Sequence, residues 1–142
     1  MTWPAGCVKH LPADWHVTLH FIGNVDTQRL VNLAEAVAVP FQPFELVLDQ
    51  PVVWPRGVAV LLATEVPRPL RTLHDRLGHA LRGLDLPVES RPYLPHVTLA
   101  RRAEAAIAPK AFAPLVWWVR RFALVISTGD RDKRYRMIRQ YL

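Results

Sequence analysis

The 142-residue chain has one cysteine, Cys7, so it cannot form an intrachain disulfide bond. It also has no uninterrupted apolar run close to the roughly 20 residues that span a bilayer. The first residues show neither the basic segment nor the apolar segment of a secretory signal. We therefore expect a cytoplasmic protein that does not insert into a membrane.

Several motifs that carry chemistry are missing. There is no glycine-rich nucleotide loop, no Gly-x-Ser-x-Gly elbow, no His-Glu-x-x-His and no Cys-x-x-Cys. His16 and His20 are four residues apart, which on a strand is about 13 Å and too far to share one ion. His74 and His79 diverge on an expected helix, and we take them as solvated. The sequence therefore predicts no metal site and no cofactor.

Lysine is scarce, and arginine makes up most of the positive charge. Only three of the 18 Lys and Arg residues are Lys, and the formal net charge is +6. A guanidinium group binds phosphate through two parallel hydrogen bonds, so this composition suits a polyanionic ligand. Genome composition can produce the same bias, so charge alone supports nucleic-acid binding only weakly.

Hydrophobic spacing predicts an α+β fold. Alternating or wholly apolar runs predict strands, and apolar residues at helical spacing predict two helices. Pro67 and Pro69 open the second helix, and Gly83 suits its C-terminal end. This order of elements is typical of a single domain with antiparallel sheet. The expected strands are 15–22, 44–48, 58–63, 94–101, 119–127 and 135–141, and the expected helices are about 26–39 and 68–83.

One tetrapeptide occurs twice, as His16-Val17-Thr18-Leu19 and as His96-Val97-Thr98-Leu99. On a strand, residues i and i+2 share a face, so each copy presents a histidine and a threonine together. A chance repeat is the alternative, but in both copies the flanking apolar residues alternate with the polar pair. Two such strands side by side would bring two imidazoles and two hydroxyls together.

Two histidines can catalyse phosphodiester chemistry without a metal ion. One neutral imidazole accepts a proton from the attacking oxygen, and a protonated one gives a proton to the leaving oxygen. The ordinary pKa of histidine, near 6.5, lets both forms coexist around neutral pH. Threonine hydroxyls can donate hydrogen bonds to the non-bridging oxygens of the phosphate.

These residues resemble a known family. The two motifs, with Phe21-Ile22-Gly23 after the first and Ala100-Arg101 after the second, are similar to those of the LigT-like 2H phosphoesterases. Within that family the chain resembles the RNA 2′,3′-cyclic phosphodiesterases, also called 2′-5′ RNA ligases. The resemblance runs from about residue 9 to the C-terminus and includes residues 44–46, 58–63 and 91–93.

The resemblance implies a bilobal fold over residues 1–142, with pseudo-twofold lobes, outer helices and a central basic cleft. It implies that His16 is the general acid and His96 the general base, with Thr18 and Thr98 binding the phosphate. Arg101 would add positive charge. Strict alternation, however, turns Arg101 away from His96, so it can act only if the strand ends or bulges near residue 100.

Two further residues are candidates for substrate contact. Tyr93 could stack on a base or belong to the core, and His20 shares the expected strand face of His16. Relatives usually have an apolar strand and a helix before the first motif, and we expect both to be absent here. An exposed sheet edge would then favour self-association.

The leading hypothesis is a metal-independent RNA 2′,3′-cyclic phosphodiesterase that leaves a 2′-phosphate. A non-catalytic protein that binds RNA ends through the same cleft is the alternative. Ligation of RNA ends through a 2′-5′ bond is the reverse chemistry and needs no other residues. The expected partner in each case is RNA, or a nucleotide, with a cyclic phosphate end.

Overall fold

The computed structural model describes residues 1–129 and 134–142, and the chain divides into two compact units. Each unit is built from three separate stretches of the sequence. Unit 1 comprises Met1–Thr18, Glu45–Val66 and Tyr93–Trp117, and unit 2 comprises Leu19–Phe44, Pro67–Pro92 and Trp118–Leu142. In the described residues, no helix has the length and apolar character needed to cross a membrane.

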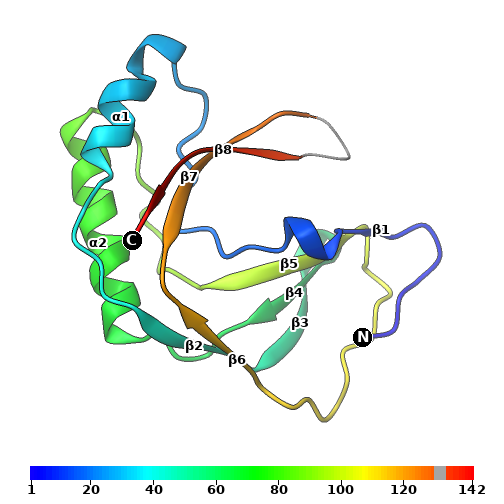
Figure 1. Ribbon diagram of the computed structural model, residues 1–142. Coiled ribbons are helices and arrows are strands. Elements are labelled where there is room, and N and C mark those ends of the chain that lie inside the picture. Colours follow the sequence, from blue (N-terminus) through cyan, green and yellow to red (C-terminus); the bar gives the residue numbers. More distant parts are fainter. Residues whose placement is uncertain (130–133) are drawn as a thin grey trace. The chain divides into compact units, whose positions relative to one another are not determined.

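Unit 1 contains a four-stranded sheet in the order β1-β5-β4-β3 (Figure 1). All three strand pairs are antiparallel, as expected. The central strands β4 and β5 are rich in β-branched and aliphatic residues. They supply the buried side chains of this sheet, which are Ala59, Val60, Leu61, Val97 and Ala100. The strands are β1 (Val8–Lys9), β3 (Gln50–Trp54), β4 (Val58–Leu62) and β5 (His96–Arg101).

Strand β3 was not expected from the sequence. It contains Pro51, which has no amide hydrogen and is therefore tolerated only at a sheet edge or a bulge. The structure places β3 at the edge, where it pairs with β4 alone. A short 3₁₀ turn, η3 (Pro55–Gly57), connects the two strands.

Strand β5 contains a bulge that changes which way its last residues face. Val60 pairs with Thr98, whereas the preceding Ala59 pairs with Ala100, so Leu99 is an extra residue with no partner on β4. Alternation therefore restarts after Leu99. Ala100 turns to the buried side with Ala59, and both are fully buried.

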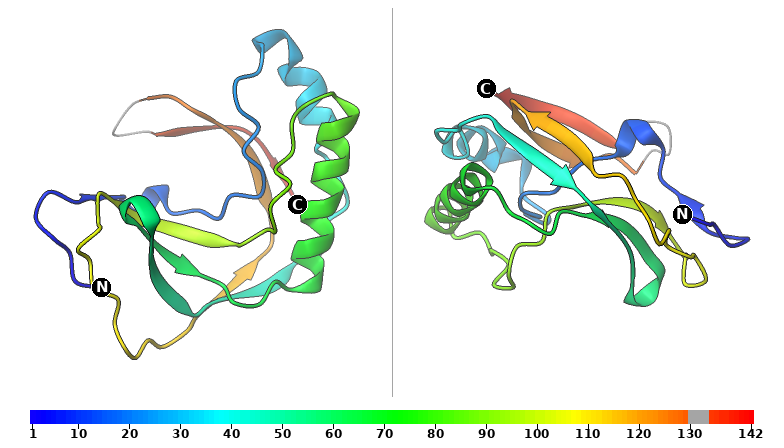
Figure 2. Two further views of the ribbon diagram at one scale, coloured as in Figure 1. Left: turned by 180° about the vertical axis from the view of Figure 1, so that it is seen from behind. Right: turned by 90° about the horizontal axis from the view of Figure 1, so that it is seen from below.

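Unit 2 contains the helices and a strand pair. The 3₁₀ turn η2 (Thr27–Arg29) leads into α1 (Leu30–Ala36), which is shorter than the expected helix over about 26–39. Helix α2 spans Arg68–Gly83, as predicted. The Asp26 carboxylate caps the first turn by accepting from the Gln28 amide at 3.0 Å. The two helices lie side by side in both views of Figure 2, and the apolar stripe of α2 is buried at Leu70, Leu73, Leu77 and Leu81.

Strands β7 (Phe122–Ser127) and β8 (Tyr135–Tyr141) pair in antiparallel fashion in unit 2. The Tyr141 hydroxyl donates to the Ala34 carbonyl at 2.7 Å, which joins β8 to α1. The predicted strand 135–141 is confirmed.

The predicted strand 119–127 is wrong at its start, because the chain forms two strands there. Strand β6 (Leu115–Val119) pairs with β2 (Phe44–Leu48), and β7 begins after a break at residues 120–121. Two consecutive arginines, Arg120 and Arg121, are exposed at the break. An apolar run gives no signal of where a chain changes its pairing partner.

The predicted strand over 15–22 is also wrong. Only Val17 makes a bridge, opposite Val97 of β5, and the residues around it belong to no strand. Before Val17, the chain leaves the edge of β5 through the 3₁₀ turn η1 (Pro12–Asp14). The segment therefore lacks a partner over most of its length.

Candidate active site

The bridge between Val17 and Val97 places the two His-x-Thr pairs side by side in unit 1. In an antiparallel bridge the residues on either side of the bridged pair face each other. His16 is therefore opposite Thr98, and Thr18 is opposite His96. The valines point to the other face, where Val97 is buried. The prediction that the motifs come together is thus met by one bridge rather than by two full strands.

Both histidines are oriented in the same way. Nδ1 of His16 lies 2.7 Å from the carbonyl oxygen of Asp14, and Nδ1 of His96 lies 2.7 Å from that of Leu94. A carbonyl only accepts, so each Nδ1 carries the proton. In the neutral imidazole, Nε2 is then the basic nitrogen, and in the imidazolium, Nε2 carries the acidic proton. In both rings, Nε2 is therefore the nitrogen that is available for proton transfer.

Two different local structures supply these carbonyls. Asp14 ends the 3₁₀ turn η1, which aims its carbonyl at the residue two positions later. Leu94 precedes Pro95, and the proline ring restricts Leu94 to extended backbone. Sequence reasoning missed both acceptors. Their signal is a proline before each motif, Pro12 and Pro95, which fixes the backbone ahead of the histidine.

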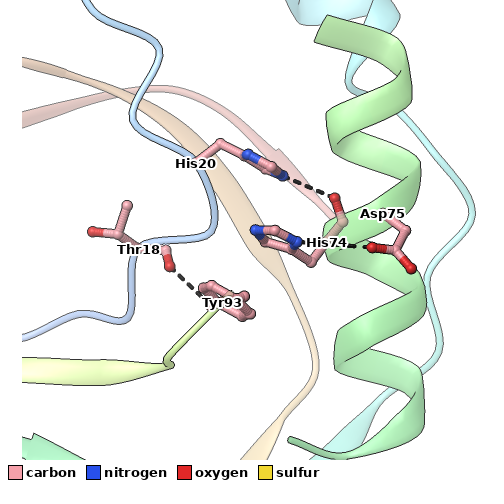
Figure 3. A network of polar contacts seen from close by, with 5 residues as sticks. All are labelled: Thr18, His20, His74, Asp75 and Tyr93. Atoms are coloured by element: carbon pink, nitrogen blue, oxygen red, sulfur yellow. Dashed lines mark hydrogen bonds and ion pairs between the residues drawn. The ribbon is translucent and has the colours of Figure 1, made fainter. Parts of the chain in front are cut away.

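Tyr93 joins the two motifs through the backbone. Its hydroxyl donates to the Thr18 carbonyl at 2.8 Å (Figure 3). Burial raises the pKa of the Tyr93 phenol far above its usual value, so the hydroxyl keeps its proton and stays a donor. The sequence suggested a core aromatic or a base-stacking residue for Tyr93. The observed contact adds a third role, that of holding Thr18 close to the strand that carries His96.

The bulge at Leu99 decides the direction of Arg101. Strict alternation would send Arg101 to the buried face, but the extra residue returns it to the face of His96 and Thr98. Arg101 is exposed there. The condition that the sequence set for Arg101, a bulge near residue 100, is therefore fulfilled.

An aromatic side chain that the sequence did not single out contacts His96. The Trp54 ring lies edge-on to the imidazole, with 4.6 Å between centroids and 66° between ring planes. Its sequence signal is weak, because Trp54 stands at the end of an apolar run interrupted by proline.

His20 lies in unit 2 and packs against α2. Its Nε2 donates to the His74 carbonyl at 2.8 Å, and the two rings stack at 4.0 Å (Figure 3). The interpretation of His74 as a solvated helix residue is wrong, because its side chain is only 18% exposed. Burial, and then the proximity of His20, lower the pKa of His74 to about 4. Substrate contact by His20 stays a prediction, but the shared strand face that suggested it does not form.

Within residues 1–129 and 134–142, no group of three or more His, Cys, Asp or Glu side chains is placed to hold a metal ion. The chemistry available in unit 1 is therefore that of two imidazoles, two hydroxyls and a guanidinium group on one face of a sheet.

Two curated proteins are similar in sequence to this chain. The chain is 28% identical to an RNA 2′,3′-cyclic phosphodiesterase of Geobacillus stearothermophilus, over 88% of this chain and 44% of that protein. It is 32% identical to an RNA 2′,3′-cyclic phosphodiesterase of Bacillus subtilis strain 168, over 64% and 53%. The chain thus spans about half the length of the curated relatives it matches.

Solved structures show the same fold. The crystal structure of Escherichia coli LigT complexed with 3′-AMP has a TM-score of 0.86 and 26% identity, and the match covers 98% of this chain and 83% of that one. Residues 8–131 match the description of the 2′-5′ RNA ligase superfamily. The chain therefore belongs to the 2′-5′ RNA ligase superfamily, whose members include the LigT-like 2H phosphoesterases.

Proposed function

We propose that this protein is a metal-independent RNA 2′,3′-cyclic phosphodiesterase that opens the cyclic phosphate to a 2′-phosphate. The observation that carries the proposal is the Val17–Val97 bridge, which sets two identically oriented His-x-Thr pairs side by side. The activity of the two bacterial relatives and the fold of LigT support it.

The proposed reaction needs one histidine in each protonation state. Nε2 of His96 accepts a proton from water while the water oxygen attacks phosphorus. The bond between phosphorus and O3′ breaks, and Nε2–H of His16 gives its proton to O3′. The products are a 2′-phosphomonoester and a free 3′-hydroxyl. The roles of His16 as acid and His96 as base follow the family resemblance.

Three other side chains would hold the phosphate. The hydroxyls of Thr18 and Thr98 donate to the non-bridging oxygens, where negative charge grows as the water attacks. The guanidinium group of Arg101 adds positive charge on the same face. None of these steps requires a metal ion, so the reaction should proceed in EDTA.

The test is to incubate the purified protein, in EDTA, with a 2′,3′-cyclic nucleotide and with RNA carrying that end. We expect a 2′-phosphate product, and a fall of about 10²–10⁴-fold in kcat for His16→Ala and for His96→Ala. The double variant should be little worse than either single one, because the two residues act as a unit. His79→Ala, a change at an exposed histidine of α2, is the matched control.

Several results would overturn the proposal. Full activity in either single variant would exclude the two-histidine mechanism, and loss of activity in EDTA would indicate a metal. Tight binding of RNA with a 2′-phosphate end by folded protein, without turnover, would instead support the RNA-end binding alternative. Adding RNA with a 5′-hydroxyl end to the same assay would reveal 2′-5′ ligation.

A further inference from the structure

The side chain of Trp54 reaches His96 across the sheet of unit 1. Gln50 pairs with Leu62, and Leu62 pairs with His96, so these three residues share one face. Alternation along β3 puts Trp54, four residues after Gln50, on that face as well. The ring contact of 4.6 Å between Trp54 and His96 agrees with this shared face.

The backbone of Trp54 is itself constrained. Pro55 follows it and disfavours helical backbone at the preceding residue, and Trp54 accordingly has φ −78° and ψ 161°. The next turn is anchored, because the Gly57 carbonyl accepts from the Ala103 amide at 2.8 Å. A rigid backbone at its base gives the indole a defined position.

Two contacts restrain the His96 ring. The hydrogen bond from Nδ1 to the Leu94 carbonyl fixes one edge of the imidazole but still allows the ring to tilt about that bond. The indole of Trp54 meets the ring at 66° and blocks the tilt on its side. Together they limit the directions that Nε2 can take.

We propose that Trp54 is a positioning residue for His96, whose indole keeps Nε2 directed at the water it activates. The inference rests on the proposed function and adds to it a residue outside both motifs. Misplacing a reacting group by about 1 Å can cost roughly 10²-fold in rate. Loss of the indole therefore acts on the chemical step and leaves phosphate binding by the threonines in place.

The test compares Trp54→Leu with Trp54→Phe on the 2′,3′-cyclic nucleotide. We expect Trp54→Leu to lower kcat by about 10–100-fold with KM nearly unchanged. Trp54→Phe keeps an aromatic ring and should stay within several-fold of the native kcat. Trp118→Leu, at a tryptophan with 56% exposure, is the matched control. A native kcat in Trp54→Leu, or a change in KM alone, would overturn the proposal.

A double-variant cycle separates positioning from a general structural role. If Trp54 acts through His96, Trp54→Leu should have no further effect on the residual rate of His96→Ala. If Trp54→Leu lowers the residual rate of His96→Ala by the same factor as it lowers kcat of the native chain, the proposal is refuted.

A second readout does not depend on turnover. The indole ring shifts the His96 imidazole proton signals in NMR spectra, so Trp54→Leu should move these signals while leaving those of His79 in place. Unmoved His96 signals would refute the proposal even in a chain without activity. Moved signals together with no turnover by the native chain would refute only the proposed function.

Discussion

The stacked pair of His20 and His74 predicts a specific dependence of stability on pH. The folded chain lowers the pKa of His74 from 6.5 to about 4, mainly through burial and secondly through the charge of His20. Arg71 acts in the same direction and Asp75, at 4.0 Å from Nδ1, in the opposite one. The unfolded chain therefore takes up this proton near pH 6.5, and the folded chain takes it up only near pH 4.

Between these two values the unfolded state binds more protons, so acid favours unfolding. The contribution of His74 to stability is complete above pH 6.5, is lost as the pH falls to about 4, and changes no further below that. A tenfold change in proton affinity corresponds to about 1.4 kcal/mol, which gives an upper bound of about 3.4 kcal/mol. Because the side chain keeps 18% exposure, solvent screening reduces the expected value to about 1–2 kcal/mol.

Urea denaturation at a series of pH values between 7.5 and 3.5 measures this loss. His74→Gln removes the titrating group, so its free energy of unfolding should fall by about 1–2 kcal/mol less than that of the native chain over this range. His79→Gln, at an exposed position of the same helix, should keep the native pH dependence. Equal pH dependence in His74→Gln and the native chain would refute the reasoning, as would an NMR titration of His74 near 6.5.

Two further predictions concern the face of β5 and the contact between the motifs. Arg101→Ala should weaken binding of a 2′-phosphate nucleotide about tenfold and reduce the salt dependence of that binding. Arg102→Ala, just past the end of β5, should change the affinity less than twofold. Equal effects of the two substitutions would contradict the argument that the bulge turns Arg101 toward His96. Tyr93→Phe should lower the free energy of unfolding by about 0.5–1.5 kcal/mol, because the Thr18 carbonyl loses its donor. An unchanged urea denaturation curve would show that this hydrogen bond contributes nothing to stability.

The proximity of the two motifs was easier to predict than the strands around them. The repeated His-x-Thr motif identifies four side chains, and their types alone indicate proton transfer at a phosphate. The segment 15–22 looked like a strand because its residues alternate, yet alternation reports extended backbone and not the presence of a partner. The structure gives this segment a single bridge, at Val17, and alternation does not reveal a missing partner.

Arg101 and Trp54 show what the sequence could not supply. The direction of Arg101 depends on an extra residue in β5, and a bulge of this kind leaves no mark in the composition of the strand. Trp54 on β3 contacts His96 on β5, and β4 lies between these two strands. The position of Trp54 therefore depends on the register of β3 against β4 and on that of β4 against β5. Helix α2, by contrast, matches the expected range of about 68–83, because its apolar stripe and the prolines at its start are local signals. Gly83 is the last residue of the helix, and Leu84 is its C-cap.

The single bridge between Val17 and Val97 has a consequence for the order of folding. Strands β3 and β4 are joined by a three-residue turn and can pair early, whereas the bridge between positions 17 and 97 and the β1–β5 pair both join stretches about 80 or more residues apart. The entropy of closing these loops is recovered only after β5 has joined the sheet. The two histidines can therefore meet only after β5 has joined β4, and a chain that has formed β3 and β4 alone has no means of transferring a proton.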